Sequence, residues 1–96
     1  MITEIAGLYI RKEEDMLFEQ AFGKAQAYIR SAEGYITHEL LKCLEVENKY
    51  LLLVRWDKLE SHTIGFRQSE EYKSWRILLH GFYDPFPLVE HYKKVF

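Results

Sequence analysis

Hydrophobic positions in the first third of the chain change from a strand pattern to a helix pattern. Residues 4–11 are rich in Ile, Leu and Tyr, which is typical of a strand. Three acidic residues at positions 13–15 follow, where a helix N-terminus favours negative charge. An apolar residue then recurs at every fourth position along one stripe: Leu17, Ala21, Ala25 and Ile29. This spacing predicts a helix through Ser31, and Gly34 fits its termination.

Two strands joined by a polar turn are predicted next. Residues 35–46 alternate loosely between apolar and polar positions, and residues 47–49 are typical of a hairpin turn. Residues 50–56 are the clearest strand in the chain, because they begin with five consecutive apolar positions. A strand that is apolar at both parities has both of its faces covered in a folded protein. We therefore expect this strand to be buried on both sides of a sheet.

A second helical region, in two pieces, is predicted after Asp57. The first piece is short and covers residues 59–67, and the second runs from Ser69 to about residue 82. Ser69 precedes two Glu residues, which is typical of an N-cap with an acidic first turn. The apolar stripe of the second piece consists of Tyr72, Trp75, Leu78, Leu79 and Phe82. Two Pro residues make residues 84–87 irregular, and residues 88–96 are the last expected strand.

This order of strand, helix, strand, strand, helix and strand predicts one α+β domain over residues 1–96. It is the split β-α-β arrangement of ferredoxin-like folds, with a four-stranded antiparallel sheet. Two helices cover only one face of such a sheet, yet the strand at residues 50–56 is apolar on both faces. A bare apolar sheet face is unusual on a soluble monomer. We therefore expect a homodimer in which a second copy packs against the uncovered face.

Composition narrows the classes of partner. Aromatic residues make up 16% of the chain, more than a small core needs, so some are expected to line an interface or a pocket. The net charge is −2 without a basic run, so no nucleic-acid partner is expected. No apolar run approaches the roughly 20 residues that span a bilayer, and the first residues do not resemble a signal peptide. With Cys43 as the single cysteine, these features favour a cytoplasmic protein without a membrane partner.

Three stretches match a known family once this order of elements is in place. They are YLLLVRWDKLESH at residues 50–62, GFRQS at residues 65–69, and YDPFPLVEHY at residues 83–92, with Tyr72, Trp75 and Leu79 between the last two. Together they resemble the antibiotic biosynthesis monooxygenase (ABM) domain family, and the last stretch is similar to the ending of one bacterial subgroup. The similarity covers nearly the whole chain. It implies a dimeric α/β barrel with a ligand cavity between the sheet and the helices of each subunit.

The resemblance also implies a class of chemistry. Some family members oxidise aromatic polyketides without flavin or metal, because a deprotonated phenol or enol can itself give an electron to dioxygen. Such a site needs a base, an orienting donor and a dry cavity. The haem-degrading members instead use an Asn in the first strand, a Trp in the second helical region and an iron-ligating His. Here residues 4–11 contain no Asn, and Phe66 and Arg76 stand at the Trp and His positions, so haem degradation is not expected.

His62 is the first candidate for the catalytic base, since a histidine titrates near neutral pH and this one begins the second helical region. The alternative is a helix-start histidine that bonds to the backbone or to a partner chain. Six residues are candidates for binding substrate, with Phe66 and Trp75 foremost: His38, Trp56, Phe66, Trp75, His80 and Tyr83. For each of these six the alternative is an ordinary place in the core or an interface. No histidine spacing or acidic cluster is specific for a metal, so no metal site is expected.

The sequence therefore predicts a homodimer that acts on a small aromatic or quinone-like molecule as a cofactor-independent monooxygenase, with no bound cofactor. A second hypothesis stays open, in which the chain is a non-catalytic dimer that binds a small organic molecule or is associated with stress. The two differ in whether a histidine projects into a cavity beside aromatic walls.

Overall fold

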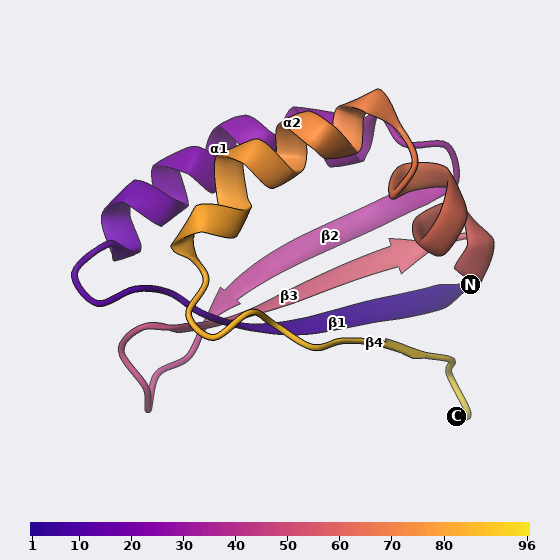
Figure 1. Ribbon diagram of the computed structural model, residues 1–96. Helices are drawn as coiled ribbons and strands as arrows, with labels where there is room; N and C mark the ends of the chain where they lie inside the picture. The colour runs from indigo at the N-terminus through magenta and orange to yellow at the C-terminus, as the bar shows by residue number, and fades with distance from the viewer.

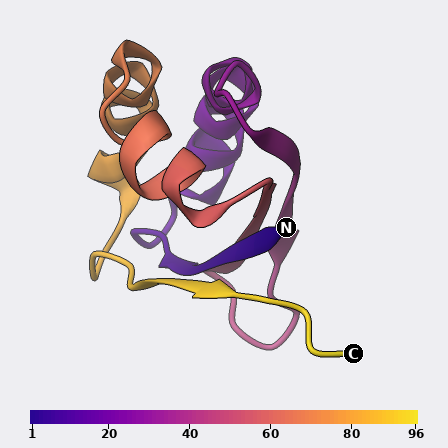
Figure 2. The same cartoon turned by 90° about the vertical axis from the view of Figure 1, so that its right-hand side faces the viewer.

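Two layers make up the protein: a four-stranded sheet, and two helices that lie side by side across one of its faces (Figure 1). The structure is a computed structural model that describes all 96 residues. The view along the sheet shows both helices on the same side of it (Figure 2). The elements follow the predicted order: β1 (Ile2–Tyr9), α1 (Asp15–Arg30), β2 (Tyr35–Lys42), β3 (Lys49–Trp56), η1 (Ser61–Phe66), α2 (Glu70–Leu79), η2 (His80–Phe82) and β4 (Val89–Tyr92).

The sheet confirms the ferredoxin-like prediction. Its strand order is β2-β3-β1-β4, and each neighbouring pair is antiparallel. The strand of five apolar positions, β3, is central, as expected. Its residues alternate strictly between buried and half-buried, because one face meets the helices and the other meets no element of the same chain. The helix-facing side chains of β1 and β3 join residues of α1 and α2 in one core, which includes Leu8, Val54, Phe18, Ile29 and Leu79.

The ends of several elements differ from the prediction. β1 begins two residues earlier than expected, and β2 ends at Lys42 because the chain from residue 43 to residue 48 makes the connecting loop. β4 is only four residues long, because it pairs with β1 alone over that span. The first helical piece runs over residues 59–66, close to the predicted 59–67, and its larger part, η1, is π-helical at Ser61–Phe66. The predicted cap of α2 is confirmed, since Ser69 Oγ accepts a hydrogen bond from the Tyr72 backbone N–H at 3.1 Å.

Gly34 holds the start of η1 against the end of α1. Its φ of 86° lies in the left-handed region, which favours glycine. A side chain at this position would overlap Asp57 Oδ1 and Ser61 Oγ. The Gly34 carbonyl accepts a hydrogen bond of 2.8 Å from the Asp57 backbone N–H, and Ser61 Oγ donates to Asp57 Oδ1 at 2.5 Å. This junction sets where η1 begins and thereby places His62, the next residue.

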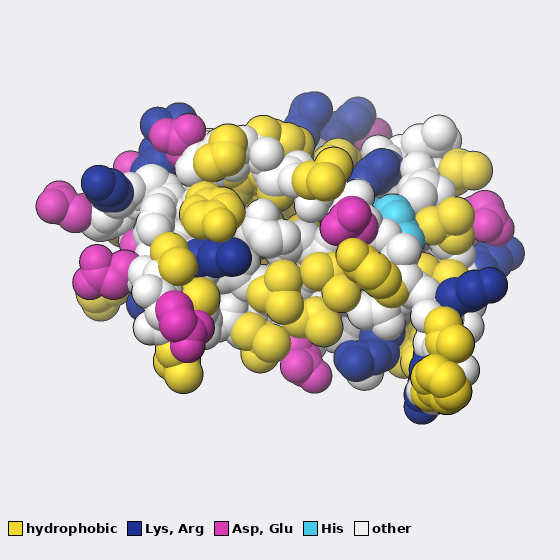
Figure 3. All heavy atoms as spheres, turned by 90° about the horizontal axis from the view of Figure 1, so that it is seen from below, with side chains coloured by type: hydrophobic (Ala, Val, Ile, Leu, Met, Phe, Trp, Pro, Cys, Tyr) yellow, Lys and Arg dark blue, Asp and Glu magenta, His cyan; other side chains and the backbone are white.

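The sheet face away from the helices is open in the single chain and apolar in its middle, with charged residues such as Glu39, Arg55 and Glu90 around it. Two cross-strand pairs occupy it, Ile5 with Leu53 and Leu51 with Leu41. Leu41 is 45% exposed. Figure 3 views the molecule from this side and shows hydrophobic side chains gathered across its middle. Among the helices, none is both long and apolar enough to cross a membrane.

Candidate functional site

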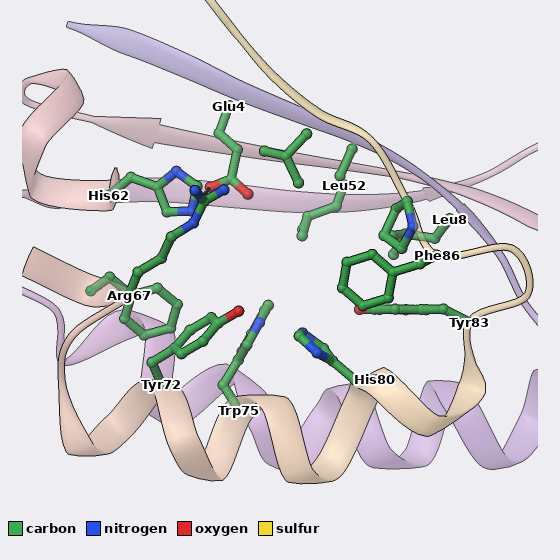
Figure 4. Close-up of a pocket in the computed structure, with 14 residues that line it drawn as sticks. Glu4, Leu8, Leu52, His62, Arg67, Tyr72, Trp75, His80, Tyr83 and Phe86 are labelled. Atoms are coloured by element: carbon green, nitrogen blue, oxygen red, sulfur yellow. Dashed lines mark ion pairs between the residues drawn. The ribbon is translucent and has the colours of Figure 1, made fainter. Parts of the chain in front are cut away.

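A cavity of about 420 Å³ lies between the sheet and α2, with η1 at one end and the segment after α2 at the other. Figure 4 shows Glu4, His62 and Arg67 gathered at one end and His80, Tyr83 and Phe86 at the other. Fourteen residues line it, and most of them are apolar or aromatic: Glu4, Ala6, Leu8, Leu52, His62, Phe66, Arg67, Tyr72, Trp75, His80, Tyr83, Phe86, Pro87 and Val89. A mostly apolar cavity with a few convergent polar groups is the usual form of a small-molecule site.

Aromatic rings from η1 and α2 make the wall that faces the sheet. Phe66 and Trp75 are both nearly buried and meet edge to face, with ring centroids 5.9 Å apart. Phe66 also meets Tyr72 edge to face at 5.3 Å. Such contacts between flat rings restrict their movement, because each ring packs against the edge of another. The wall therefore offers a rigid aromatic surface to a ligand.

A buried carboxyl and a buried imidazole meet at the other wall. Glu4 and His62 are 5% and 4% exposed. His62 Nε2 lies 3.4 Å from Glu4 Oε1, and the same oxygen accepts a hydrogen bond of 3.0 Å from Trp56 Nε1. The imidazole ring of His62 stacks on the Trp56 indole, with centroids 5.2 Å apart and planes 19° from parallel. Trp56 thus orients both members of the pair.

The second nitrogen of His62 is also engaged. His62 Nδ1 lies 2.8 Å from His91 Nε2, so one of the two nitrogens donates and the other accepts. His91 is half-buried on β4, directly across from Glu4 of β1 in the sheet register. His62 therefore has no ring nitrogen left over for a direct bond to a ligand while these contacts hold.

Burial dominates the protonation of this pair. It raises the pKa of Glu4 from 4.5 to about 7, although the Trp56 hydrogen bond and the Arg67 charge both oppose that rise. Burial likewise lowers the pKa of His62 from 6.5 to about 3, and the positive charge of Arg67 and the neighbouring His91 act in the same direction. The two groups are close enough for an ion pair, but desolvation disfavours charge on both. At a pH between these two pKa values, Glu4 is a neutral carboxylic acid and His62 is a neutral imidazole.

His80 is the histidine with free nitrogens in the cavity. It follows α2, and its ring lies among three aromatic rings, with centroids 6.1 Å from Tyr72, 5.6 Å from Tyr83 and 5.1 Å from Phe86. Its side chain makes no hydrogen bond to the protein, which leaves both nitrogens available to a ligand. Burial, and then the charge of Arg76, lower the pKa of His80, so the ring is neutral at physiological pH.

The structure places five of the seven predicted site residues on the cavity wall: His62, Phe66, Trp75, His80 and Tyr83. Trp56 lies behind His62 and contacts it without lining the cavity. His38 is elsewhere, between α1 and β2. Its two ring nitrogens lie 2.5 Å from the Tyr35 hydroxyl and 2.8 Å from Gln26 Oε1, outside the cavity. No group of three or more potential ligands is arranged to hold a metal ion.

Glu4 is a functional group that sequence reasoning missed. It shares a parity with Ala6, Leu8 and Ile10, all of which face the helices. An acidic residue that points to the same side of a strand as three core residues was a usable signal of a buried carboxyl. The signal was hidden because Ile5 and Tyr9 are apolar at the other parity, so the inward face of the strand was ambiguous.

Comparisons with known proteins agree with the geometry. Residues 1–76 match the sequence profile of the family described as antibiotic biosynthesis monooxygenase. The uncharacterized protein YczJ of Bacillus subtilis (strain 168) is 53% identical over 95 residues, which are 99% of this chain and 100% of that protein.

Solved structures share the fold over almost their whole length. A Bordetella bronchiseptica protein assigned to the antibiotic biosynthesis monooxygenases superposes with a TM-score of 0.94 at 29% identity, covering 99% of this chain and 97% of its own. SnoaB, a cofactor-independent oxygenase from Streptomyces nogalater, has a TM-score of 0.84 at 14% identity, covering 97% of this chain and 91% of its own. At that identity the likeness to SnoaB shows a common fold.

Proposed function

Because the chain belongs to the antibiotic biosynthesis monooxygenase family, we propose that it oxidises a small aromatic or quinone-like molecule with dioxygen, without a bound cofactor. The observation that carries this proposal is the cavity, in which an aromatic wall faces a buried carboxyl and imidazole. The fold shared with SnoaB, a cofactor-independent oxygenase, supports the same class of reaction.

The proposed reaction needs no external reductant. A phenol that loses its O–H proton becomes electron-rich enough to give one electron to dioxygen, and the resulting radical and superoxide combine to form a carbon–oxygen bond. The hydroperoxide then breaks its O–O bond, which leaves one oxygen atom on the ring as a carbonyl and releases the other as water. The ring supplies all four electrons, so a phenol and dioxygen become a quinone and water.

The residues of the cavity suit the separate parts of this reaction. Phe66 and Trp75 hold a flat ring and exclude water, which favours electron transfer from a phenolate over side reactions. The Glu4 and His62 pair, the latter predicted as the base, is the proton acceptor on the sheet side. His80, opposite this pair and next to Tyr83, orients a second polar group of the substrate through its free nitrogens.

The proposed active form is a homodimer. The outer face of the sheet carries Ile5, Leu41, Leu51 and Leu53 in adjacent cross-strand pairs, and no other element of the chain covers them. Tyr92 of the edge strand β4 adds an aromatic side chain that is 49% exposed. Two copies that pack sheet against sheet would bury both patches at once, because a two-fold interface joins the same surface on each subunit.

An oxygen electrode tests the proposed reaction directly. We expect oxygen uptake when the protein is mixed with members of a panel of naphthols and naphthoquinols, and we expect His62→Ala to lower kcat/KM by about 100-fold, the size typical of a lost acid–base group. The matched control is Glu47→Gln, in the exposed turn before β3. No uptake with any member of the panel, or His62→Ala equal to wild type, would refute the mechanism. Binding of the same compounds without uptake would support the non-catalytic hypothesis.

A further inference from the structure

A continuous line of proton-exchanging groups leads from the cavity to the edge of the sheet. Glu4 lines the cavity, its Oε1 lies 3.4 Å from His62 Nε2, and His62 Nδ1 lies 2.8 Å from His91 Nε2. His91 does not line the cavity. It is half-buried on β4, an edge strand, and its side chain makes its hydrogen bond through Nε2, which leaves Nδ1 without a partner in the chain. The line therefore begins at a buried acid and ends at a group near solvent.

We propose that Glu4 accepts the proton of an acidic O–H group bound in the cavity, and that His62 passes this proton to His91 at the edge of the sheet. The inference rests on the proposed function, in which a phenol must ionise before it reacts with dioxygen. The relay works in both directions, because the proton that leaves the phenol is needed again when the second oxygen atom leaves as water.

The protons balance without forming a charged imidazole. With Glu4 protonated, its O–H donates to His62 Nε2, His62 Nδ1–H donates to His91 Nε2, and His91 carries its proton on Nδ1. When a proton leaves from His91 Nδ1, both contacts reverse their direction. The Glu4 carboxylate then accepts from His62 Nε2–H, and His62 Nδ1 accepts from His91 Nε2–H. Each histidine has only changed its tautomer.

This tautomer exchange suits the surroundings of His62. Its ring is 4% exposed, and the Arg67 charge adds to the cost of an imidazolium there. A relay that moves both protons together never creates that imidazolium. The contact of 3.4 Å between Glu4 and His62 must shorten for transfer. Contacts of this kind are often long before a ligand binds.

The fold holds the three groups in line. Glu4 and His91 are cross-strand neighbours on the helix-facing side of β1 and β4. Trp56 fixes the carboxyl through its Nε1–H and supports the His62 ring by stacking.

Three other titratable or charged groups act on the line. Burial is the larger influence on the pKa of Glu4, His62 and His91. The Arg67 charge opposes the rise of the Glu4 pKa and adds to the fall of the two histidine pKa values, and so favours the state from which the proton has left. Tyr72 and Tyr83 lie nearby on the cavity wall, where burial, and then the charges of Tyr72 and Glu4, raise the pKa of Tyr83. None of the three lies between His62 and His91, so the line itself has no competing acceptor among them.

Nitrogen NMR of the protein labelled with ¹⁵N-histidine tests the relay without any turnover. We expect the protonated and bare nitrogens of His62 to exchange places as the pH passes from 5 to 9, with His91 changing in the same pH interval. In Glu4→Gln, both rings should keep one tautomer over this range, whereas Glu47→Gln should behave as wild type. A His62 that keeps one tautomer in the wild type, or that becomes an imidazolium above pH 5, would overturn the relay.

Measurements of oxygen uptake then test whether the reaction depends on the relay. We expect Glu4→Gln to lower kcat/KM by about 100-fold. His91→Ala should lower it about tenfold, and imidazole in the buffer should restore it, because a small base can replace a terminal proton acceptor but not a structural contact. Tautomer exchange without oxygen uptake would refute the oxygenase and leave the relay standing. Oxygen uptake with full activity in Glu4→Gln would refute the relay alone.

Discussion

Glu4 and His62 illustrate how position, rather than residue type, decides protonation. A glutamic acid and a histidine side by side ordinarily form an ion pair, yet burial shifts both of them toward their neutral forms. The free energy of unfolding must reflect these shifts, because a group that titrates differently in the folded and unfolded chains makes stability depend on pH.

The two groups act on stability in opposite pH ranges. The raised pKa of Glu4 means that its contribution is complete below about pH 4.5 and is lost as the pH rises through 7. The lowered pKa of His62 means that its contribution is complete above about pH 6.5 and is lost as the pH falls toward 3. We expect Glu4→Gln to remove the loss of stability that the ionisation of Glu4 causes as the pH rises through 7.

Urea unfolding at pH 5 and at pH 8 measures this effect. From pH 5 to pH 8, the free energy of unfolding of Glu4→Gln should rise relative to that of wild type. The rise should be at most about 3 kcal/mol, the size that the raised pKa of Glu4 permits. Glu47→Gln, in an exposed turn, should show no such gain. A Glu4→Gln variant whose difference from wild type is equal at both pH values would contradict the raised pKa.

At the scale of elements, the junction between α1, β3 and η1 positions the site. His62 follows directly on Ser61, whose hydroxyl binds Asp57, and Gly34 leaves the space that both of them occupy. The π-helical form of η1 is uncommon, and such segments frequently lie at functional sites. The cavity wall made by Phe66 depends on the same segment, because Phe66 is its last residue.

Gly34→Ala tests this junction. The new side chain would meet Asp57 and Ser61, and the φ of 86° is strained for alanine, so we expect a loss of about 2 kcal/mol or more in the free energy of unfolding. The matched control is Gly23→Ala on the exposed side of α1, where a side chain meets nothing within 4 Å. There we expect a gain of about 0.5–1 kcal/mol from higher helix propensity. Equal effects of the two substitutions would show that Gly34 has no special role.

At the scale of the whole molecule, the sheet separates two tasks. Its inner face holds the core and the cavity, and its outer face carries the apolar pairs of β1, β2 and β3. This separation allows a proposed dimer to form without blocking the cavity, since the two surfaces lie on opposite sides of the same strands.

Light scattering coupled to size-exclusion chromatography tests the dimer. We expect twice the 11.6 kDa of one chain at micromolar concentration. Leu53→Glu, at the middle of the outer face, should shift the protein to the monomer, because a buried unpaired charge costs several kcal/mol. Leu44→Glu, in the β2–β3 loop and 94% exposed, should leave the mass unchanged. A wild-type mass near 11.6 kDa would refute the proposed dimer.

The sequence alone was sufficient for the order of the elements, the central place of β3 and the Ser69 cap of α2. These features depend on periodicity and on residue preferences within about one turn of helix or one strand, and both can be read from neighbouring positions. The family resemblance implied a cavity, and Phe66 and Trp75, the foremost candidates for its wall, both line it. The ends of β2 and β4 were less predictable, because a strand lasts only as long as its partner pairs with it.

Only the tertiary structure decided which polar groups meet. Glu4, Trp56, His62 and His91 come from four separate elements, and their contacts depend on strand register and on the path of η1. It also placed His38 beside Tyr35 and Gln26, away from the cavity. Burial, which governs the protonation of Glu4 and His62, is a property of the assembled layers. For that reason the residue types in this chain indicated the chemistry, while the packing of the sheet against its helices determined where a proton can go.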